Sequence, residues 1–151
     1  MLELAREADW AAVNRLSIQV HDLHARLCPD LYIHSDEPLP LDVFLQSIRD
    51  RLLYVARQDG CVVGYVLLSF IRREGNGVVA HKELRLDHIC VDKSFRRRGI
   101  GRAMIADVRA LAKVFGCREI LLGVHAQNDD AVVFYQKCGF LIRTINLEMK
   151  L

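Results

Sequence analysis

The sequence predicts a single mixed α/β domain over residues 1–151, built around a largely antiparallel sheet. Asp59-Gly60 lies between two strand-like segments and favours a tight hairpin turn, so those strands are expected to be antiparallel neighbours. Farther along, a strand, an amphipathic helix and a short apolar strand follow one another, which is the order of a parallel strand–helix–strand unit. The length is sufficient for one domain with its own core.

Apolar periodicity and turn residues define the other elements. Apolar residues at spacings of three and four predict a helix from Asp9 to about Leu27, which Cys28-Pro29-Asp30 breaks. Asn128 is placed to cap a later helix that ends at Gly139. The predicted order β-α-α-β-β-β-α-β-α-β consists of residues 1–5, 9–27, 41–50, 52–57, 61–72, 82–92, 100–116, 120–124, 128–139 and 140–149.

Composition and charge argue against several classes of protein. Hydrophobic residues make up 52% and charged residues 26% of the chain, as in ordinary globular domains. The net charge of +2 is far below that of typical nucleic-acid-binding domains. The five cysteines are scattered and form no C-x-x-C pair, which argues against a disulfide framework or a cysteine zinc site. Without a secretory signal pattern or an apolar run approaching about 18 residues, we expect a cytoplasmic protein with no membrane segment.

A basic turn that contains two glycines is the most informative stretch. Arg96-Arg97-Arg98-Gly99-Ile100-Gly101-Arg102-Ala103 lies between the strand at 82–92 and the start of the next helix. The N-terminus of a helix carries partial positive charge, which disfavours cations and favours anions. Arginines are expected there if a bound anion offsets them, and the glycines let the backbone amides approach that anion closely. The stretch therefore predicts a pyrophosphate-binding cradle rather than an ordinary solvated basic loop.

The predicted fold places this cradle at an opening in the sheet. The strands near 86–92 and 120–124 are expected to be parallel neighbours joined through the helix. If they diverge, a V-shaped opening lies above the helix N-terminus, and a ligand with its phosphate in the cradle sends its reactive end into that opening. Neither G-x-x-x-x-G-K-S/T nor G-x-G-x-x-G occurs, so the two common nucleotide-binding motifs do not explain the site.

Two motifs in this half of the chain resemble those of the GNAT superfamily of acetyl-CoA-dependent N-acetyltransferases. The family signature Q/R-x-x-G-x-G/A is matched by Arg96–Gly101. A second family pattern, N-x-x-A-x-x-F-Y-x-x-x-G-F, is matched by Asn128, Ala131, Phe134, Tyr135, Gly139 and Phe140. The resemblance covers about residues 50–150 well. It holds only in outline over 6–50, the region that in this family helps to shape the acceptor pocket.

The resemblance implies acetyl-CoA as co-substrate and an amine as acceptor, with no metal. Carried over, the backbone amides from Arg97 to Ala103 hold the pyrophosphate, and the backbone of 89–91 pairs with the pantetheine arm like an added strand. Asn128 either contacts the cofactor or simply caps its helix. The implied cofactor-binding set is Ile89, Cys90, Val91, Arg96, Arg97, Arg98, Gly99, Ile100, Gly101, Arg102, Ala103, Asn128 and Tyr135.

Acetyl transfer to an amine needs a neutral nucleophile, stabilisation of an oxyanion and protonation of a departing thiolate. The resemblance assigns the last role to Tyr135, a phenol that stays protonated at pH 7. A backbone N–H at a strand bulge around Cys90 could polarise the thioester carbonyl. The group that deprotonates the amine stays open between Asp87, which is the first candidate, Glu83, His88 and water chains. Glu83 shares the strand face of Asp87 if no bulge intervenes.

Other reactive residues give weaker indications of function. Cys90 could be an acylated nucleophile, but a buried cysteine is usually inert packing. His21 and His24 lie three residues apart on the first helix with Asp22 between them. No third metal ligand is evident beside them, so contact with the acceptor is the better interpretation of this pair.

These observations favour an N-acetyltransferase in which the amine attacks acetyl-CoA directly in a ternary complex. The alternative is a non-catalytic module that binds or senses acyl-CoA. Nucleic-acid binding through residues 93–102 is disfavoured by the low net charge and by the lack of aromatic residues among the basic ones. The acceptor stays open between a small amine, an amino acid, an aminoglycoside and a protein lysine or N-terminus. A homodimer is compatible with the resemblance.

Overall fold

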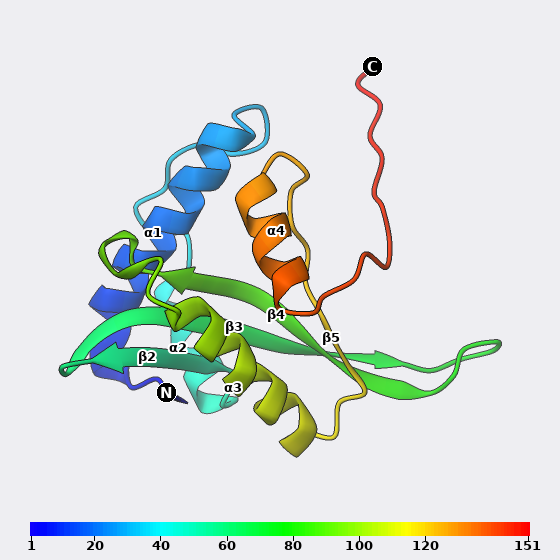
Figure 1. Cartoon of the computed structure of the whole chain (residues 1–151), viewed down its shortest axis with the longest axis horizontal. Coiled ribbons are helices and arrows are strands. Elements are labelled where there is room, and N and C mark those ends of the chain that lie inside the picture. Colours follow the sequence, from blue (N-terminus) through cyan, green and yellow to red (C-terminus); the bar gives the residue numbers. More distant parts are fainter.

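The computed structural model describes all 151 residues and contains one five-stranded sheet in the order β1-β2-β3-β4-β5 (Figure 1). The first four strands are antiparallel neighbours, and β5 is parallel to β4. The strands are β1 (Leu2–Leu4), β2 (Leu53–Gln58), β3 (Cys61–Arg73), β4 (His81–Val91) and β5 (Glu119–Leu121). The predicted mixed and largely antiparallel α/β fold is therefore confirmed.

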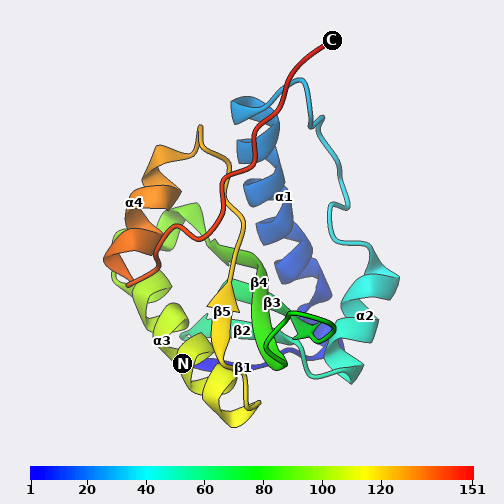
Figure 2. The same cartoon turned by 90° about the vertical axis from the view of Figure 1, so that its right-hand side faces the viewer.

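Helices cover both faces of the sheet (Figures 1 and 2). The 3-10 turn η1 leads into α1, which packs with α2 on one face, around a core that includes Tyr65 and Phe44. The other face packs against α3 and the aromatic residues of α4, around a core that includes Met104 and Leu84. The helical elements are η1 (Glu7–Asp9), α1 (Trp10–Leu27), α2 (Leu41–Arg49), η2 (Lys93–Phe95), α3 (Ile100–Val114) and α4 (Asp129–Lys137).

A register shift in β4 decides which side chains face which helix layer. Leu67 pairs with His88 while its neighbour Leu68 pairs with Leu86, so Asp87 is an extra residue with no partner on β3. The bulge expected around Cys90 therefore lies three residues earlier in the chain. Because an extra residue reverses the alternation of side chains, His88 joins the face that packs against α1.

The sheet opens between β4 and β5. Their pairing runs from Glu83 with Glu119 to Arg85 with Leu121. Beyond that point β4 continues to Val91, still paired with β3 but without β5 beside it. Figure 1 shows the two chain segments separating beyond that point, as the expected V-shaped opening requires. The edge of β4 that faces the opening consequently has no strand partner over its last residues.

The strand expected over 140–149 does not form in the structure. This segment follows α4 as an extended chain with no strand pairing, and Figure 1 shows it running away from the sheet. Its alternating pattern is that of a strand, but a strand needs a neighbour to satisfy its backbone groups, and the chain brings none beside it. No helix is both long and apolar enough to cross a membrane.

Candidate active site

The start of α3 presents backbone amides to open space. Gly99 is the residue before the helix and has φ +80°, a left-handed conformation that a residue with a Cβ adopts only with strain. No side chain caps the helix, and no atom lies within 4 Å of the place where a Cβ on Gly99 would be. Arg97 is also left-handed, with φ 64°. The first amides of a helix have no intrahelical acceptor, so this turn has the geometry that an anion site requires.

Gly101 contributes through close packing rather than through a turn. A Cβ at this position would lie 3.2 Å from Cζ of Phe134 and 3.7 Å from Cγ2 of Val91. The absence of a side chain therefore lets α4 pack closely against the first turn of α3. The two predicted glycines have separate roles. Gly99 forms the turn, and Gly101 allows α4, which carries Tyr135, to pack closely against the start of α3.

The loop that carries the cradle is fixed from α1. Asp92 is buried, its carboxylate accepts a hydrogen bond from the Ser94 amide, and it forms an ion pair with Arg15 of α1. The hydrogen bond from Arg15, followed by that from the Ser94 amide, lowers the pKa of Asp92. The Lys93 amide donates to Oε1 of Gln19 at 3.0 Å. These contacts hold the strand end and the cradle in one position relative to α1.

The residues predicted to bind the cofactor are not equivalent in the structure. Arg97 and Arg102 are exposed, Arg98 stacks over Phe95 at 5.2 Å, and Arg96 Nε donates to the Val91 carbonyl at 2.9 Å. The Ala103 amide already donates to the Gly99 carbonyl at 3.0 Å. That amide is therefore not free for a pyrophosphate, and the cradle is restricted to the amides that precede it. Asn128 caps α4, since its side chain accepts from the Ala131 amide at 3.3 Å.

Cys90 has the environment of a packing residue. Its side chain is buried, and Sγ donates to the Leu16 carbonyl at 3.4 Å. Burial raises the pKa of the Cys90 thiol to about 11, so the thiolate needed for nucleophilic attack is scarce at neutral pH. At this point the backbone of β4 is accessible from one side. Its outer edge has no strand partner from Leu86 onward because β5 has ended.

A cleft of about 1980 Å³ extends from this strand end across the opening of the sheet. It is bounded by the C-terminal half of α1, the end of β4, residues 120–128, the inner face of α4 and residues 141–150. The predicted site residues that line it are Asp87, Ile89, Cys90, Val91, Arg96, Asn128 and Tyr135. Glu83 does not line it.

Tyr135 projects from α4 into this cleft. Its ring packs edge-on against Phe134 and Phe140, with ring centroids 5.3 Å and 5.7 Å away. Burial raises the pKa of the Tyr135 phenol to about 12, so it stays protonated at neutral pH. The structure thus presents a fixed proton donor at the same cleft as the unpaired edge of β4.

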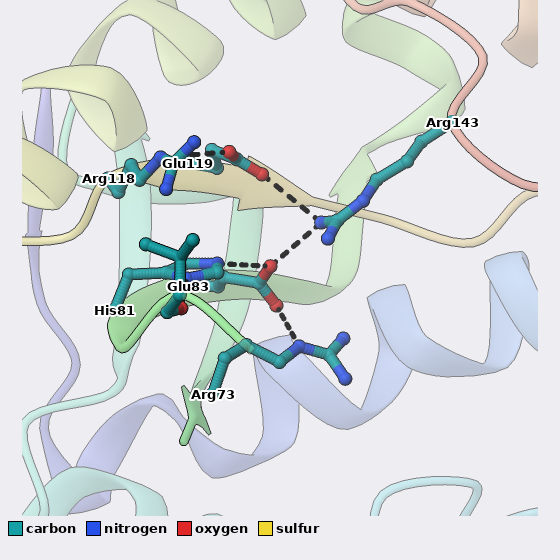
Figure 3. Close-up of polar contacts among 7 residues, drawn as sticks. Arg73, His81, Glu83, Arg118, Glu119 and Arg143 are labelled. Atoms are coloured by element: carbon teal, nitrogen blue, oxygen red, sulfur yellow. Dashed lines mark hydrogen bonds and ion pairs between the residues drawn. The ribbon is translucent and has the colours of Figure 1, made fainter. Parts of the chain in front are cut away.

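Glu83 lies in an ion-pair cluster instead (Figure 3). Its side chain is fully buried, and its carboxylate accepts hydrogen bonds from Arg73 at 2.9 Å, His81 at 3.0 Å and Arg143 at 2.8 Å. Burial by itself would raise the pKa of Glu83, but the bonds from Arg143, His81 and Arg73 outweigh it and lower the pKa to about 2. Arg143 also reaches Glu119 at 3.1 Å. A carboxylate held in this way is a poor proton acceptor.

Asp87 and His88 are neighbours at the bulge and both line the cleft. The Asp87 carboxylate, which is 21% exposed, forms an ion pair with Arg85. His88 Nδ1 lies 3.1 Å from the hydroxyl of the buried Tyr65. Burial lowers the pKa of His88, while the charge of Asp87 opposes that effect, so the imidazole is neutral at pH 7.

A group of aromatic rings forms the far wall of the cleft, at the end of α1. The Tyr32 hydroxyl lies 2.9 Å from Nε2 of His125, and the ring of His24 is 5.5 Å from that of His125. Burial, and then the nearby His125 and His21, lower the pKa of His24. The sequence indicated the two α1 histidines only. Tyr32 and His125 stand alone in loops 93 residues apart, so no spacing pattern could have revealed them.

Three acids in the second half of α1 and the loop after it are engaged in ion pairs. His34 is held by Asp22 at 2.8 Å and by Asp36 at 3.0 Å, and its hydrogen bonds to Asp22 and then to Asp36 raise the pKa of His34. Asp30 forms an ion pair with Lys150. On this side the cleft is lined by the imidazoles of His24 and His125 and the phenol of Tyr32.

The chain is thus an α/β protein with a glycine-containing turn at a helix start and a cleft at the opening of its sheet. Comparisons with known proteins agree with this class. A model of the acetyltransferase (GNAT) family matches residues 18–140, so the chain belongs to the GNAT family. The resemblance of the two sequence motifs is thereby confirmed.

Individual relatives share only a low sequence identity with this chain. N-acetyltransferase family 8 member 3 of Rattus norvegicus is 31% identical over 108 residues, which are 72% of this chain and 46% of that protein. The chain thus spans about half the length of this relative and of its Mus musculus counterpart. A crystal structure of a mutant Bacillus halodurans protein has a TM-score of 0.95 at 22% identity and covers 100% and 99% of the two chains. An aminoglycoside N-acetyltransferase in complex with CoA has a TM-score of 0.71 at 20% identity, covering 100% of both chains.

Proposed function

We propose that this protein transfers an acetyl group from acetyl-CoA to a primary amine by direct attack in a ternary complex. The observation that carries the proposal is the continuity of one path. Arg96, in the turn that leads into α3, the outer edge of β4 and the Tyr135 side chain all line a single cleft. Acetyl-CoA has a pyrophosphate, an amide-containing pantetheine arm and a thioester in the same order.

The cradle would hold the pyrophosphate through the amides of the turn from Arg97 to Arg102. Gly99 provides the left-handed turn, and the exposed arginines of this stretch supply positive charge around it. The backbone of Ile89–Val91 would bind the pantetheine amides as an added strand. This path ends beside Tyr135, where the thioester would lie.

Tyr135 would act on the leaving group. As the amine nitrogen forms a bond to the acetyl carbon, the carbon–sulfur bond breaks and its electron pair stays on sulfur. The phenol of Tyr135, protonated at neutral pH, would donate its proton to that thiolate. An unpaired amide at the outer edge of β4 would stabilise the oxyanion of the tetrahedral intermediate.

Asp87 would accept the proton of the ammonium form of the acceptor. It lines the cleft at the bulge, where the local break in pairing directs its side chain away from the regular alternation of the strand. His88 is the second candidate, because a neutral imidazole at the same bulge can accept a proton. Glu83, whose three hydrogen bonds stabilise its charged form, is not retained as a base.

The acceptor would enter between the end of α1 and residues 122–128, where His24, Tyr32 and His125 line the cleft. This wall suits a compact amine that can hydrogen-bond to rings and stack on them. We place the enzyme in the cytoplasm, where its five free cysteines would stay reduced.

Calorimetric titration of acetyl-CoA tests the cofactor site. We expect micromolar binding by the wild-type protein and its loss in Gly99→Glu, which adds both strain and negative charge to the cradle. Lys113→Glu is the matched control, because it places a glutamate on an exposed position of the same helix far from the cradle. Equal binding by wild type and Gly99→Glu would contradict the cradle.

A panel of amines with acetyl-CoA then separates the enzyme from the alternative, a module that binds or senses acyl-CoA without transfer. The enzyme predicts release of CoA with at least one amine and loss of turnover in Tyr135→Phe at unchanged acetyl-CoA affinity. Tight binding with no transfer to any amine in a panel of polyamines, amino acids, aminoglycosides and peptides would favour the module. Unchanged turnover in Tyr135→Phe would refute the role of the phenol.

A further inference from the structure

A buried tyrosine and a histidine of the cleft form a hydrogen-bonded pair. The Tyr65 hydroxyl lies 3.1 Å from Nδ1 of His88, and the Tyr65 side chain is fully buried. The imidazole of His88 is only partly buried and lines the cleft, so it connects the core to the open space. No step of the proposed acetyl transfer uses this contact.

The burial of Tyr65 decides which nitrogen of His88 carries the proton. Burial raises the pKa of the Tyr65 phenol, so the hydroxyl has a proton to donate at neutral pH. Nδ1 of His88 is the only hydrogen-bond partner of that hydroxyl. If Nδ1 carried the proton, the phenol proton would be buried without an acceptor, which is unfavourable. Nδ1 therefore accepts the bond from Tyr65, and the proton of the neutral imidazole lies on Nε2.

The protonated nitrogen is the one that is open to the cleft. Nε2 of His88 has no hydrogen-bond partner within the chain, whereas the only buried side-chain nitrogen or oxygen atom without a partner is Oγ of Ser69. Nε2 is therefore not buried, and it belongs to a residue that lines the cleft. His88 thus offers a hydrogen-bond donor to a ligand, while its lone pair on Nδ1 is occupied by Tyr65.

His88 reaches the cleft from the side of α1. Its partner Tyr65 belongs to the core between the sheet and α1, whereas Tyr135 packs against the core on the opposite face, with α3 (Figure 2). Asp87, the proposed proton acceptor, is the residue before His88, and the bulge allows both to line the cleft. An amine that lies at Asp87 therefore has its neighbouring atoms within reach of His88.

We propose that Tyr65 holds His88 as a hydrogen-bond donor for an oxygen atom of the acceptor, so that the enzyme prefers amines that carry a hydroxyl or carbonyl oxygen close to the nitrogen. His88 contacts the substrate, and Tyr65 is a positioning residue that acts through it. The substrate preference rests on the proposed function, whereas the tautomer of His88 does not. His88 thereby leaves the candidates for the base, because its nitrogen at the cleft has no free lone pair.

The tautomer can be measured without any substrate. With ¹⁵N in the six histidines, long-range ¹H–¹⁵N spectra distinguish a protonated ring nitrogen from a bare one, and the signals of His88 are those missing in His88→Leu. We expect protonated Nε2 and bare Nδ1 in the wild type. Tyr65→Phe keeps the ring and removes the hydroxyl, so it should shift the Nδ1 resonance and populate the second tautomer.

Tyr54→Phe is the matched control for this measurement. It removes the hydroxyl of another buried tyrosine, which belongs to the core on the opposite face of the sheet. The His88 signals should stay in place in this variant. A wild type with the proton on Nδ1, or an unchanged Nδ1 resonance in Tyr65→Phe, would overturn the proposal.

Two isosteric amines test the substrate preference. Ethanolamine carries a hydroxyl where propylamine carries a methyl group, and the wild type should show the higher kcat/KM with ethanolamine. In His88→Leu the ratio of the two kcat/KM values should fall about fivefold, as expected for the loss of one neutral hydrogen bond. His88→Gln should restore part of the ratio, because its amide N–H lies near the position of Nε2. A wild type that favours propylamine, or an unchanged ratio in His88→Leu, would refute the preference.

The division of the loss between KM and kcat separates a donor from a base. Loss of a binding contact should raise the KM for ethanolamine in His88→Leu and leave kcat within about threefold of the wild type. A fall in kcat of roughly a hundredfold in both His88→Leu and His88→Gln would show that His88 takes the proton, and would overturn the proposal. A protein that transfers acetyl to no amine would contradict the proposed function, while the ¹⁵N spectra would still decide the tautomer.

Discussion

Replacing the buried Glu83 with glutamine removes the charge at the centre of the ion-pair cluster and keeps its shape. Three donors converge on this carboxylate, from Arg73, His81 and Arg143. Their combined effect lowers the pKa of Glu83 from 4.5 to about 2, which corresponds to roughly 3 kcal/mol of stability at neutral pH. Arg73 and Arg143 are 43% and 47% exposed, so water screens part of this interaction. We therefore expect Glu83→Gln to lower the free energy of unfolding by about 2 kcal/mol.

Urea unfolding and thermal denaturation measure this loss. A change of about 2 kcal/mol lowers the melting temperature of a domain of this size by roughly 4–8 °C. The pH dependence gives a second signature. Because the folded state depresses the pKa of Glu83, its contribution is complete above pH 4.5 and disappears as the pH falls toward 2. The wild type should lose this increment on acidification, and Glu83→Gln should lack that part of the slope.

Glu119→Gln is the matched control. Glu119 belongs to the same cluster, but it is 36% exposed and pairs only with Arg118 and Arg143. Its replacement should cost less than about 1 kcal/mol. The folded Glu83→Gln protein should still bind acetyl-CoA and acetylate the acceptor found in the amine panel. A loss of turnover of a hundredfold or more at unchanged melting temperature would refute the structural role and return Glu83 to the candidates for the base.

Three further predictions follow from the site. Cys90→Ala should keep turnover. The free energy of unfolding, measured with urea, should fall by about 1 kcal/mol because the Leu16 carbonyl loses the hydrogen bond from Sγ. Abolished turnover would instead indicate an acylated cysteine. Gly99→Ala should lower the free energy of unfolding by about 1 kcal/mol in the same assay, because φ +80° is strained for alanine. Gly101→Ala should be closer to neutral, since the helix propensity of alanine offsets the 3.2 Å approach to Phe134. The opposite order of the two losses would contradict the separate roles of the glycines. Because burial lowers the pKa of His88, the unfolded state binds the proton more readily, and stability should decline as the pH falls below 6.5. This part of the decline should be absent in His88→Gln. An identical pH dependence in both proteins would show that His88 is not buried as described.

The turn before α3 and the cap of α4 could be predicted from the sequence because their geometry is local. The left-handed Gly99, the start of α3 and the cap at Asn128 depend on residues within a few positions of one another. Tyr135 was identified for a similar reason, since its motif is contiguous. The family that the two motifs indicated is the family to which the chain belongs. In each case the chemistry is written into one short stretch of chain.

The chemistry of the acceptor half depends on contacts between distant residues. A single extra residue at Asp87 changes the face on which every following side chain of β4 lies, and no propensity marks its position. Glu83 looked like a base on its strand, and only the approach of Arg73 and of Arg143, 60 residues away, turns it into the centre of an ion-pair cluster. The pairing of Tyr32 with His125 arises in the same way.

The sequence by itself determined the fold class, the glycine-containing turn before α3 and the strand-like alternation of residues 144–151, because each follows from neighbouring residues and backbone preferences. Tertiary structure alone decided which carboxylate is neutralised, where β4 bulges and that this last strand has no partner within the chain. These properties depend on which groups meet across the sheet, and the free energy of a buried charge or an unpaired strand is set by its neighbours in space.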